Sequence, residues 1–161
     1  MPEHRLLLIS RDDILKISSS KHGDKLFRQL ARLTRHGIHL LATAPQPDHW
    51  SSDHDGPDDA LLGPFSIRKR LSDAGGVLDG VYYVPRSSFT QRRNREEALR
   101  DMMNRCAISP CNCFLFSSSK KFVRAANGIG INATLLGGDL NLMSELKALG
   151  NQMPGFDAPV D

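Results

Sequence analysis

The chain opens with a short apolar segment that ends abruptly in polar and charged residues. Residues 6–9 are Leu-Leu-Leu-Ile, and the next four are Ser-Arg-Asp-Asp. A nearly continuous apolar run of this length is typical of a strand buried on both faces, as in a parallel sheet with helices on either side. Ligands of such sheets bind just beyond the carboxyl ends of the strands. Residues 10–13 are therefore a candidate functional rim, although an ordinary polar turn after a strand has the same pattern.

Strand-like and helix-like segments alternate along the rest of the chain. Helical spacing of apolar residues and turn residues predict helices at 25–36, 65–73, 95–104, 122–127 and 140–149, with strands at 38–43, 79–85, 112–117 and 131–136. Residues 14–20 are expected to form a short flap or turn, and 86–94 a polar loop. The alternation predicts a three-layer, Rossmann-like α/β fold with a mostly parallel central sheet flanked by helices.

The length and composition indicate one soluble globular domain. The chain has 161 residues, of which 40% are hydrophobic and 24% charged. We expect residues 1–150 to form the domain, with a mobile loop at 45–64 and a tail at 151–161. No apolar run approaches the roughly 20 residues needed to cross a bilayer, so no membrane association is expected. The first residues lack a signal peptide and the three cysteines are too few for a disulfide framework, which predicts a cytoplasmic location.

Arginines are concentrated in one part of the chain, although the net charge is only +3. The cluster comprises Arg86, Arg92, Arg93, Arg95, Arg100 and Arg105. It could be a solvated basic face or an anion-binding site. Nucleic-acid binding is a weaker interpretation, because no aromatic residues for base stacking interleave with these arginines.

Two sets of residues could be drawn as metal sites. The first is His49, Asp53, His54 and Asp55, in a segment that offers little to fix a coordination geometry. The second is Cys106, Cys111 and Cys113, for which packing as buried residues is the favoured interpretation. We therefore predict no metal from either set.

Residues 73–85 read Asp-Ala-Gly-Gly-Val-Leu-Asp-Gly-Val-Tyr-Tyr-Val-Pro. This segment resembles the haloacid-dehalogenase-like phosphatases, and more closely their D,D-heptose 1,7-bisphosphate and histidinol phosphatase branch. The resemblance extends over the order of motifs from Leu6 to Leu136. It implies a haloacid-dehalogenase-like fold and a site at the ends of three strands.

In the family that the chain resembles, a strand-end Asp-x-Asp carries the chemistry. Its first aspartate attacks the phosphorus, and its second is the general acid and base. The resemblance places this motif on residues 10–12, so that Ser10 occupies the nucleophile position and Asp12 remains as a vestigial acid/base. A Thr or Ser at the end of the next strand binds phosphate in the family, and Thr43 matches it.

The remaining motifs also depart from the family's pattern. Arg95 occupies the position of the lysine that neutralises phosphate, which keeps the charge but changes its shape. The aspartates that hold magnesium correspond to Ser118 and Phe122, and magnesium needs carboxylate or phosphate oxygens. The zinc-binding loop of that branch corresponds to residues 86–89, Arg-Ser-Ser-Phe, which contain neither Cys nor His. Neither magnesium nor zinc is therefore expected.

Together these departures predict a pseudoenzyme, not an active phosphatase. Such a protein would bind a protein partner or a phosphorylated small molecule without cleaving it. The predicted phosphate-binding residues are Ser10, Thr43, Arg95 and Ser118. Two alternatives stay open: a residual phosphohydrolase acting on a sugar phosphate, and nucleic-acid binding through the arginine cluster.

Overall fold

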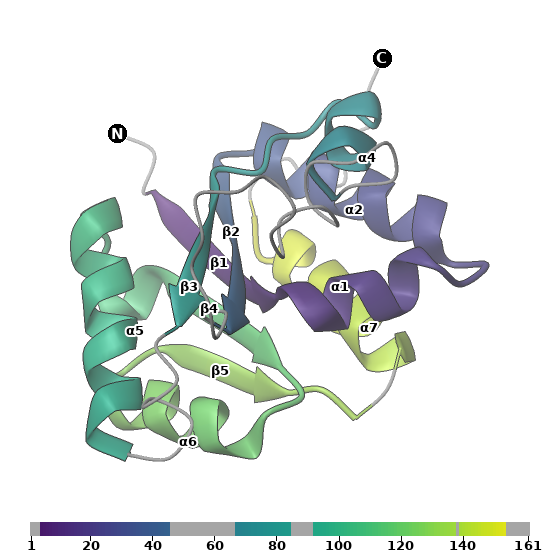
Figure 1. Ribbon diagram of the computed structural model, residues 1–161. Helices are drawn as coiled ribbons and strands as arrows, with labels where there is room; N and C mark the ends of the chain where they lie inside the picture. Colours follow the sequence, from purple (N-terminus) through teal and green to yellow (C-terminus); the bar gives the residue numbers. More distant parts are fainter. Residues whose placement is uncertain (1–3, 46–66, 85–91, 138, 154–161) are drawn as a thin grey trace, which may run out of the picture.

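A five-stranded parallel sheet forms the centre of the molecule (Figure 1). The computed structural model describes residues 4–45, 67–84, 92–137 and 139–153. The strand order is β3-β2-β1-β4-β5. The strands are β1 (Arg5–Ser10), β2 (Ile38–Pro45), β3 (Gly80–Val84), β4 (Cys113–Ser117) and β5 (Asn132–Leu135). The predicted α/β architecture with a parallel central sheet is confirmed.

The strand β1 lies at the middle of the sheet, between β2 and β4. Its four apolar residues alternate between the two faces, with Leu7 and Ile9 in one core and Leu6 and Leu8 in the other. All four are at most 1% exposed. This burial on both faces explains why the apolar run is continuous, because each face of the strand meets a layer of helices.

Among the described residues, four helices cover one face of the sheet, and they lie together on the right of Figure 1. They are α1 (Arg11–Ser18), α2 (Gly23–Arg35), α4 (Ile67–Asp73) and α7 (Asp139–Asn151). Their apolar side chains and the inward residues of β1 and β2 form one core cluster. Gly37, which follows the end of α2, has a positive φ of 92°, a conformation that suits glycine after a helix end.

The opposite face is covered by α5 (Arg92–Cys106) and α6 (Lys120–Gly128), on the left and at the bottom of Figure 1. Leu99 and Met102 of α5 and Ala125 and Ala126 of α6 are buried in the second core cluster. A short 3-10 helix (Pro110–Asn112) leads into β4. With helices on both faces, the fold has the three layers that were predicted.

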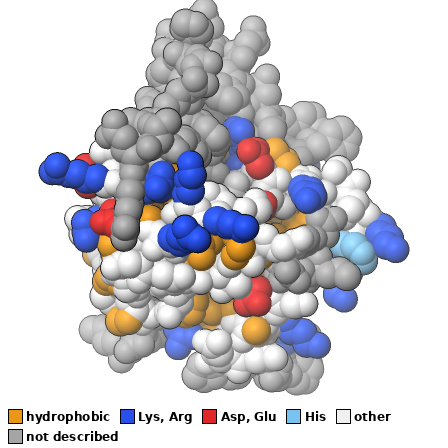
Figure 2. Space-filling model, turned by 90° about the horizontal axis from the view of Figure 1, so that it is seen from below, with side chains coloured by type: hydrophobic (Ala, Val, Ile, Leu, Met, Phe, Trp, Pro, Cys, Tyr) orange, Lys and Arg blue, Asp and Glu red, His pale blue; other side chains and the backbone are white. Residues whose placement is uncertain are grey.

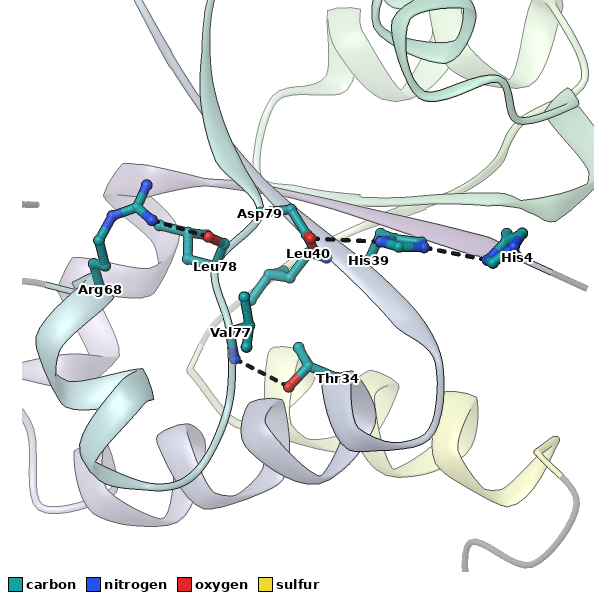
Figure 3. Close-up of polar contacts among 8 residues, drawn as sticks. All are labelled: His4, Thr34, His39, Leu40, Arg68, Val77, Leu78 and Asp79. Atoms are coloured by element: carbon teal, nitrogen blue, oxygen red, sulfur yellow. Dashed lines mark hydrogen bonds and ion pairs between the residues drawn. The ribbon is translucent and has the colours of Figure 1, made fainter. Parts of the chain in front are cut away.

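The start of β3 is fixed by Asp79, which interacts with β2 through both backbone and side chain (Figure 3). Its backbone N–H donates to the carbonyl of Leu40 at 2.9 Å, and its carboxylate Oδ2 accepts from the N–H of Leu40 at 2.8 Å. Its Oδ1 lies 3.4 Å from Nδ1 of His39, whose Nε2 lies 3.3 Å from Nδ1 of His4. These contacts set the register of β3 against β2 in the segment that carries the family resemblance.

The residues before Asp79 are held by two neighbouring helices (Figure 3). The hydroxyl of Thr34 in α2 accepts from the N–H of Val77 at 3.2 Å, and Arg68 of α4 donates to the carbonyl of Leu78 at 3.1 Å. Hydrogen bonds to α2 and to α4 therefore fix the turn that leads from α4 to β3.

Several predicted boundaries were wrong. Residues 14–20, expected as a flap or turn, belong mostly to helix α1, because Ile14 and Ile17 lie three residues apart on one helical face and are both buried. Residues 92–94, expected in a loop, are already the first turn of α5. The last helix extends to Asn151, two residues beyond its predicted end.

Some predictions concern residues that the structure does not describe. The mobile loop at 45–64 lies outside the described residues except for Pro45, the last residue of β2, and most of the tail at 151–161 also lies outside them. In the described part of the chain, no helix is both long and apolar enough to span a membrane. The predicted cytoplasmic location and the predicted division into domain and tail remain predictions.

Candidate functional site

The carboxyl ends of β1, β2 and β4 meet at one edge of the sheet. Ser10 is paired in register with Thr43, and Ser117 is the last residue of the neighbouring strand β4. With Asp12 and Ser119, these residues line a cavity of about 110 Å³. The structure therefore brings together three of the predicted site residues: Ser10, Asp12 and Thr43.

The hydroxyls of Ser10 and Thr43 are available to a ligand. Ser10 is the residue immediately before helix α1, where a serine often caps the helix, yet its side chain makes no capping hydrogen bond. Neither hydroxyl has a hydrogen-bond partner among the residues that the structure describes. Both can therefore donate to, or accept from, a group placed in the cavity.

The other wall of the cavity is apolar. It consists of Ala44, Val84, Leu99, Met102, Leu115 and Phe122. These side chains come from β2, β3, β4, α5 and α6, and they also belong to the edge of a buried core. Such a wall lowers the local dielectric and so strengthens any polar contact made by the hydroxyls.

Asp12, the predicted vestigial acid/base, lies in the first turn of α1. Its side chain is 66% exposed and its Oδ1 lies 3.4 Å from the guanidinium of Arg11. The carboxylate thus borders the cavity from the solvent side.

Ser118 is hydrogen-bonded to Asp13, a contact that the sequence does not predict. Its hydroxyl donates to Oδ1 of Asp13 at 2.8 Å, and its backbone N–H donates to Oδ2 of the same carboxylate at 3.1 Å. Ser118 and Asp13 both line a second hollow, of about 130 Å³. Sequence reasoning placed Asp13 on the rim but gave it no role, because a pair 105 residues apart leaves no local signal.

Arg95, predicted to replace the family's lysine, is 9% exposed in the first part of α5. It lies four residues before Leu99, which lines the cavity, so the two share one face of the helix. Arg95 itself is not among the described residues that line the cavity. Arg95 therefore lies in the same helix as the cavity wall, but it does not border the cavity that Ser10 and Thr43 line.

The residues at the rim do not fit a magnesium ion of the kind that the family resemblance implies. The two positions that would supply charged ligands hold the neutral hydroxyls of Ser10 and Ser118. Of the two nearby carboxylates, Asp12 contacts Arg11 and Asp13 is held by Ser118. A hard divalent ion needs several oxygens converging on one point, and no group of three or more His, Cys, Asp or Glu among the described residues has that arrangement.

The other metal predictions can be placed in part. His49, Asp53, His54 and Asp55 lie outside the described residues. Of the three cysteines, Cys113 is buried, Cys106 is half-buried and Cys111 is exposed. Burial, with a smaller contribution from Cys106, raises the pKa of the Cys113 thiol to about 12, so that this side chain is a neutral packing group at ordinary pH.

A hydrogen bond between β3 and α5 supports the apolar wall. The Tyr82 hydroxyl donates to Oδ2 of Asp101 at 2.6 Å. Burial, followed by this hydrogen bond, raises the pKa of Tyr82 to about 12. The same hydrogen bond holds the pKa of Asp101 below its usual value, with a further contribution from Arg105, whose Nε lies 3.1 Å away.

The predicted arginine cluster is largely a helix surface. Arg93 is 88% exposed and pairs with Glu97 one turn along α5, and Arg105 pairs with Asp101 in the same way. Arg86 lies outside the described residues, and the side chain of Arg92 is not described. On the face shown in Figure 2, Lys and Arg side chains cover more of the surface than Asp and Glu side chains do.

Comparison with solved structures identifies proteins that have a similar fold. The chain is similar to an uncharacterized protein from Corynebacterium glutamicum, at 16% identity over 98% of both chains, with a TM-score of 0.62. It is also similar to the D,D-heptose 1,7-bisphosphate phosphatase from Burkholderia thailandensis, at 15% identity over 87% of this chain and 84% of that one, with a TM-score of 0.55. A third is the same phosphatase from B. bronchiseptica in complex with magnesium and phosphate, at 15% identity over 87% and 86% of the chains, with a TM-score of 0.54.

No protein-family model and no curated protein sequence matches the chain. At identities this low, the structural similarity concerns the fold and not the activity. The resemblance predicted from the motif order is confirmed at that level. The chain has the haloacid-dehalogenase-like fold that these heptose bisphosphate phosphatases share.

Proposed function

We propose that this protein is a pseudoenzyme that binds a phosphorylated ligand at the rim formed by Ser10 and Thr43 and does not hydrolyse it. The observation that carries the proposal is the hydroxyl of Ser10, which caps no helix and faces the cavity at the position of the family's attacking aspartate. A phosphorylated group on a protein partner would present the same chemistry as a phosphorylated small molecule.

The binding half of the proposal rests on the groups that meet at the rim. Two hydroxyls without described partners, Ser10 and Thr43, border the cavity together with the hydroxyl-bearing Ser117 and Ser119. Ser119 is the residue before α6, whose first turn presents backbone N–H groups toward this edge of the sheet. Hydroxyl and N–H donors around a small cavity suit a phosphate oxygen, and each such bond to a charged group stabilises by about 1.5–3 kcal/mol.

The loss of hydrolysis follows from the same residues. A serine hydroxyl is a weak nucleophile unless a base removes its proton, and the carboxylate of Asp12, which borders the same cavity, contacts Arg11 instead. A neutral hydroxyl, that of Ser118, occupies the position of the family's magnesium-holding aspartate, and the neighbouring Asp13 carboxylate already accepts two hydrogen bonds from Ser118. Each missing group costs orders of magnitude in rate when the groups act together.

The binding can be tested by calorimetric titration with inorganic phosphate and with D,D-heptose 1,7-bisphosphate. Ser10→Ala and Thr43→Val each remove one hydroxyl, and we expect each to weaken binding by about tenfold. Ser19→Ala is the matched control, because its exposed hydroxyl lies at the far end of α1. Equal affinity in all four proteins would contradict the proposal, and so would the absence of any phosphate binding to the wild type.

A residual phosphohydrolase is the second candidate, and one observation favours it: the Asp12 carboxylate lines the same cavity as Ser10. This candidate predicts release of inorganic phosphate from a sugar phosphate, and a loss of that release in Asp12→Asn. Nucleic-acid binding is a third candidate, resting on the basic face in Figure 2, and it predicts binding to RNA or DNA that weakens steeply with salt.

A further inference from the structure

A second ligand-sized cavity lies at the opposite end of the sheet from Ser10. Its volume is about 380 Å³, and it is bordered by Arg5, the first residue of β1, and Asn132, the first residue of β5. The last turns of α7 form its other wall. It shares no lining residue with the cavity at the carboxyl ends of the strands, so it is independent of the function proposed above.

Arg5 brings an unsatisfied positive group to this cavity. Its Nη1 is shielded from solvent and has no hydrogen-bond partner among the described residues. A charged donor buried without a partner costs about 1–3 kcal/mol or more, so such atoms are rare in folded proteins. Because Arg5 itself lines the cavity, its guanidinium is the positive group that an anionic ligand oxygen there would meet.

A negative group lines the same cavity. Glu145 of α7 is half-buried, and no hydrogen bond or ion pair joins it to Arg5 or to any other described residue. Two opposite charges that face one cavity without meeting favour a ligand that carries both charges. Such a ligand would satisfy both groups, whereas a simple anion would leave Glu145 as a repulsive neighbour.

The rest of the lining suits a small polar molecule with one apolar part. The side chains of Asn112, Thr134 and Gln152 supply amide and hydroxyl groups, while Phe114, Phe116 and Leu149 form an apolar floor. The volume is at the lower end of the roughly 300–1,000 Å³ that small-molecule sites occupy. The lining thus has a place for a carboxylate, an ammonium and a short side chain.

We propose that this cavity binds a free α-amino acid, with its carboxylate on Arg5 and its ammonium on Glu145. The proposal assigns a second ligand site to the chain, remote from the phosphate rim. A free amino acid is a small common molecule that carries an ammonium and a carboxylate on one carbon atom, together with a variable side chain for the apolar floor.

The test is a calorimetric titration of the full chain with the twenty amino acids, and with acetate and methylamine as half-ligands. We expect at least one amino acid to bind about tenfold or more tightly than either half-ligand. Arg5→Gln and Glu145→Gln should each weaken that binding by about tenfold or more, because each leaves one ligand charge unpaired. Arg28→Gln and Glu97→Gln are the matched controls on exposed helix surfaces and should bind as the wild type does.

Nuclear magnetic resonance spectra locate the site by its amide shifts and show whether each variant is folded. Addition of the amino acid should shift the amide signals of Asn112, Asn132 and residues 145–152, and leave those of Ser10 and Thr43 in place. Arg5→Lys, which keeps the charge, should retain part of the binding if Arg5→Gln fails to fold. Binding of acetate as tight as that of the amino acid, shifts at Ser10 and Thr43, unchanged affinity in Glu145→Gln, or no binding by any amino acid would each overturn the proposal.

Discussion

Asp13 and Ser118 lie 105 residues apart in the chain, and two hydrogen bonds join them at the rim of the sheet. One carboxylate oxygen accepts from the Ser118 hydroxyl at 2.8 Å, and the other accepts from the Ser118 backbone N–H at 3.1 Å. The pair links the start of α1 to the segment between β4 and α6. The family that the chain resembles has a metal-binding aspartate at the position of Ser118. In this chain the Ser118 hydroxyl instead donates a hydrogen bond to the Asp13 carboxylate.

We predict that Asp13→Asn destabilises the fold modestly. The amide would lose the charge that strengthens both hydrogen bonds, and a partly exposed contact of this kind contributes about 1 kcal/mol. The free energy of unfolding, measured by urea denaturation, should fall by about that amount. Asp12→Asn is the control, because the side chain of Asp12 is 66% exposed, and a loss in Asp12→Asn equal to that in Asp13→Asn would contradict this account.

Restoring two carboxylates should restore magnesium binding. In Ser10→Asp/Ser118→Asp, the new carboxylates would stand beside Asp13, and a divalent ion would relieve their repulsion. We expect magnesium to raise the melting temperature of this variant in a concentration-dependent way and to leave the wild type unchanged.

The control for magnesium binding is Ser19→Asp/Ser72→Asp, which makes the same change in charge at two exposed serines away from the rim. A magnesium-dependent rise in the melting temperature of the wild type would contradict this account, because magnesium would then bind without carboxylates at positions 10 and 118.

Gly76 is predicted to be the least tolerant of the glycines near α4. A Cβ there would lie 2.6 Å from the Cα of Ala31, which is fully buried in α2, and 2.9 Å from Cδ1 of Leu71. Because backbone at this distance cannot give way cheaply, Gly76→Ala should destabilise by about 1–3 kcal/mol. Gly128→Ala, at the open end of α6, should be neutral or slightly stabilising in the same denaturation experiment. Equal effects of the two substitutions would contradict the close packing of α2 against the turn after α4.

The burial of Tyr82 and its hydrogen bond to Asp101 predict a pH dependence of stability at both ends of the scale. The pKa of Tyr82 is raised from 10.0 to about 12, so between these values the unfolded chain has released a proton that the folded chain still holds. Stability should therefore fall as the pH rises through this window. The pKa of Asp101 is lowered, so its contribution is present above the ordinary aspartate value and is lost as the pH falls through the lowered value.

Tyr82→Phe removes the buried phenol that titrates at high pH, and it removes the hydrogen bond that is the largest cause of the lowered pKa of Asp101. The difference in unfolding free energy between wild type and variant should therefore be largest near neutral pH and shrink toward both extremes. Cys113, whose pKa is also raised to about 12, is present in both proteins and cancels in the comparison. A difference that stays constant from acid to alkaline pH would contradict the hydrogen bond.

The central part of the fold could be predicted because local pattern and tertiary structure agree there. The apolar run before Ser10 is a strand buried on both faces, and strand ends of a parallel sheet must meet at one edge, so Ser10, Thr43 and Ser117 were brought together correctly. Helix α1 was missed because its eight residues contain only two buried positions, Ile14 and Ile17, and a run of serines follows it. Its stability comes from packing on α2 and not from helix propensity.

The details of the site depended on contacts between distant segments. The pairing of Asp13 with Ser118 follows from how α1 and the β4–α6 turn meet, and no spacing in the sequence encodes it. Arg95 was identified from the order of motifs alone, and only the structure shows it buried on the face of α5 that carries Leu99. The cavity at Arg5 and Glu145 joins the first strand to the last helix, which a reading of local motifs does not connect.

The most direct test of the account is the release of inorganic phosphate by the purified protein. A panel of sugar phosphates, including D,D-heptose 1,7-bisphosphate, would be incubated with the wild type and with Asp12→Asn in the presence of magnesium. We predict no release above the rate without protein, and no difference between the two proteins, because the attacking and ion-holding carboxylates are replaced by Ser10 and Ser118. Release at an enzymatic rate that Asp12→Asn abolishes would show that the rim still performs phosphatase chemistry.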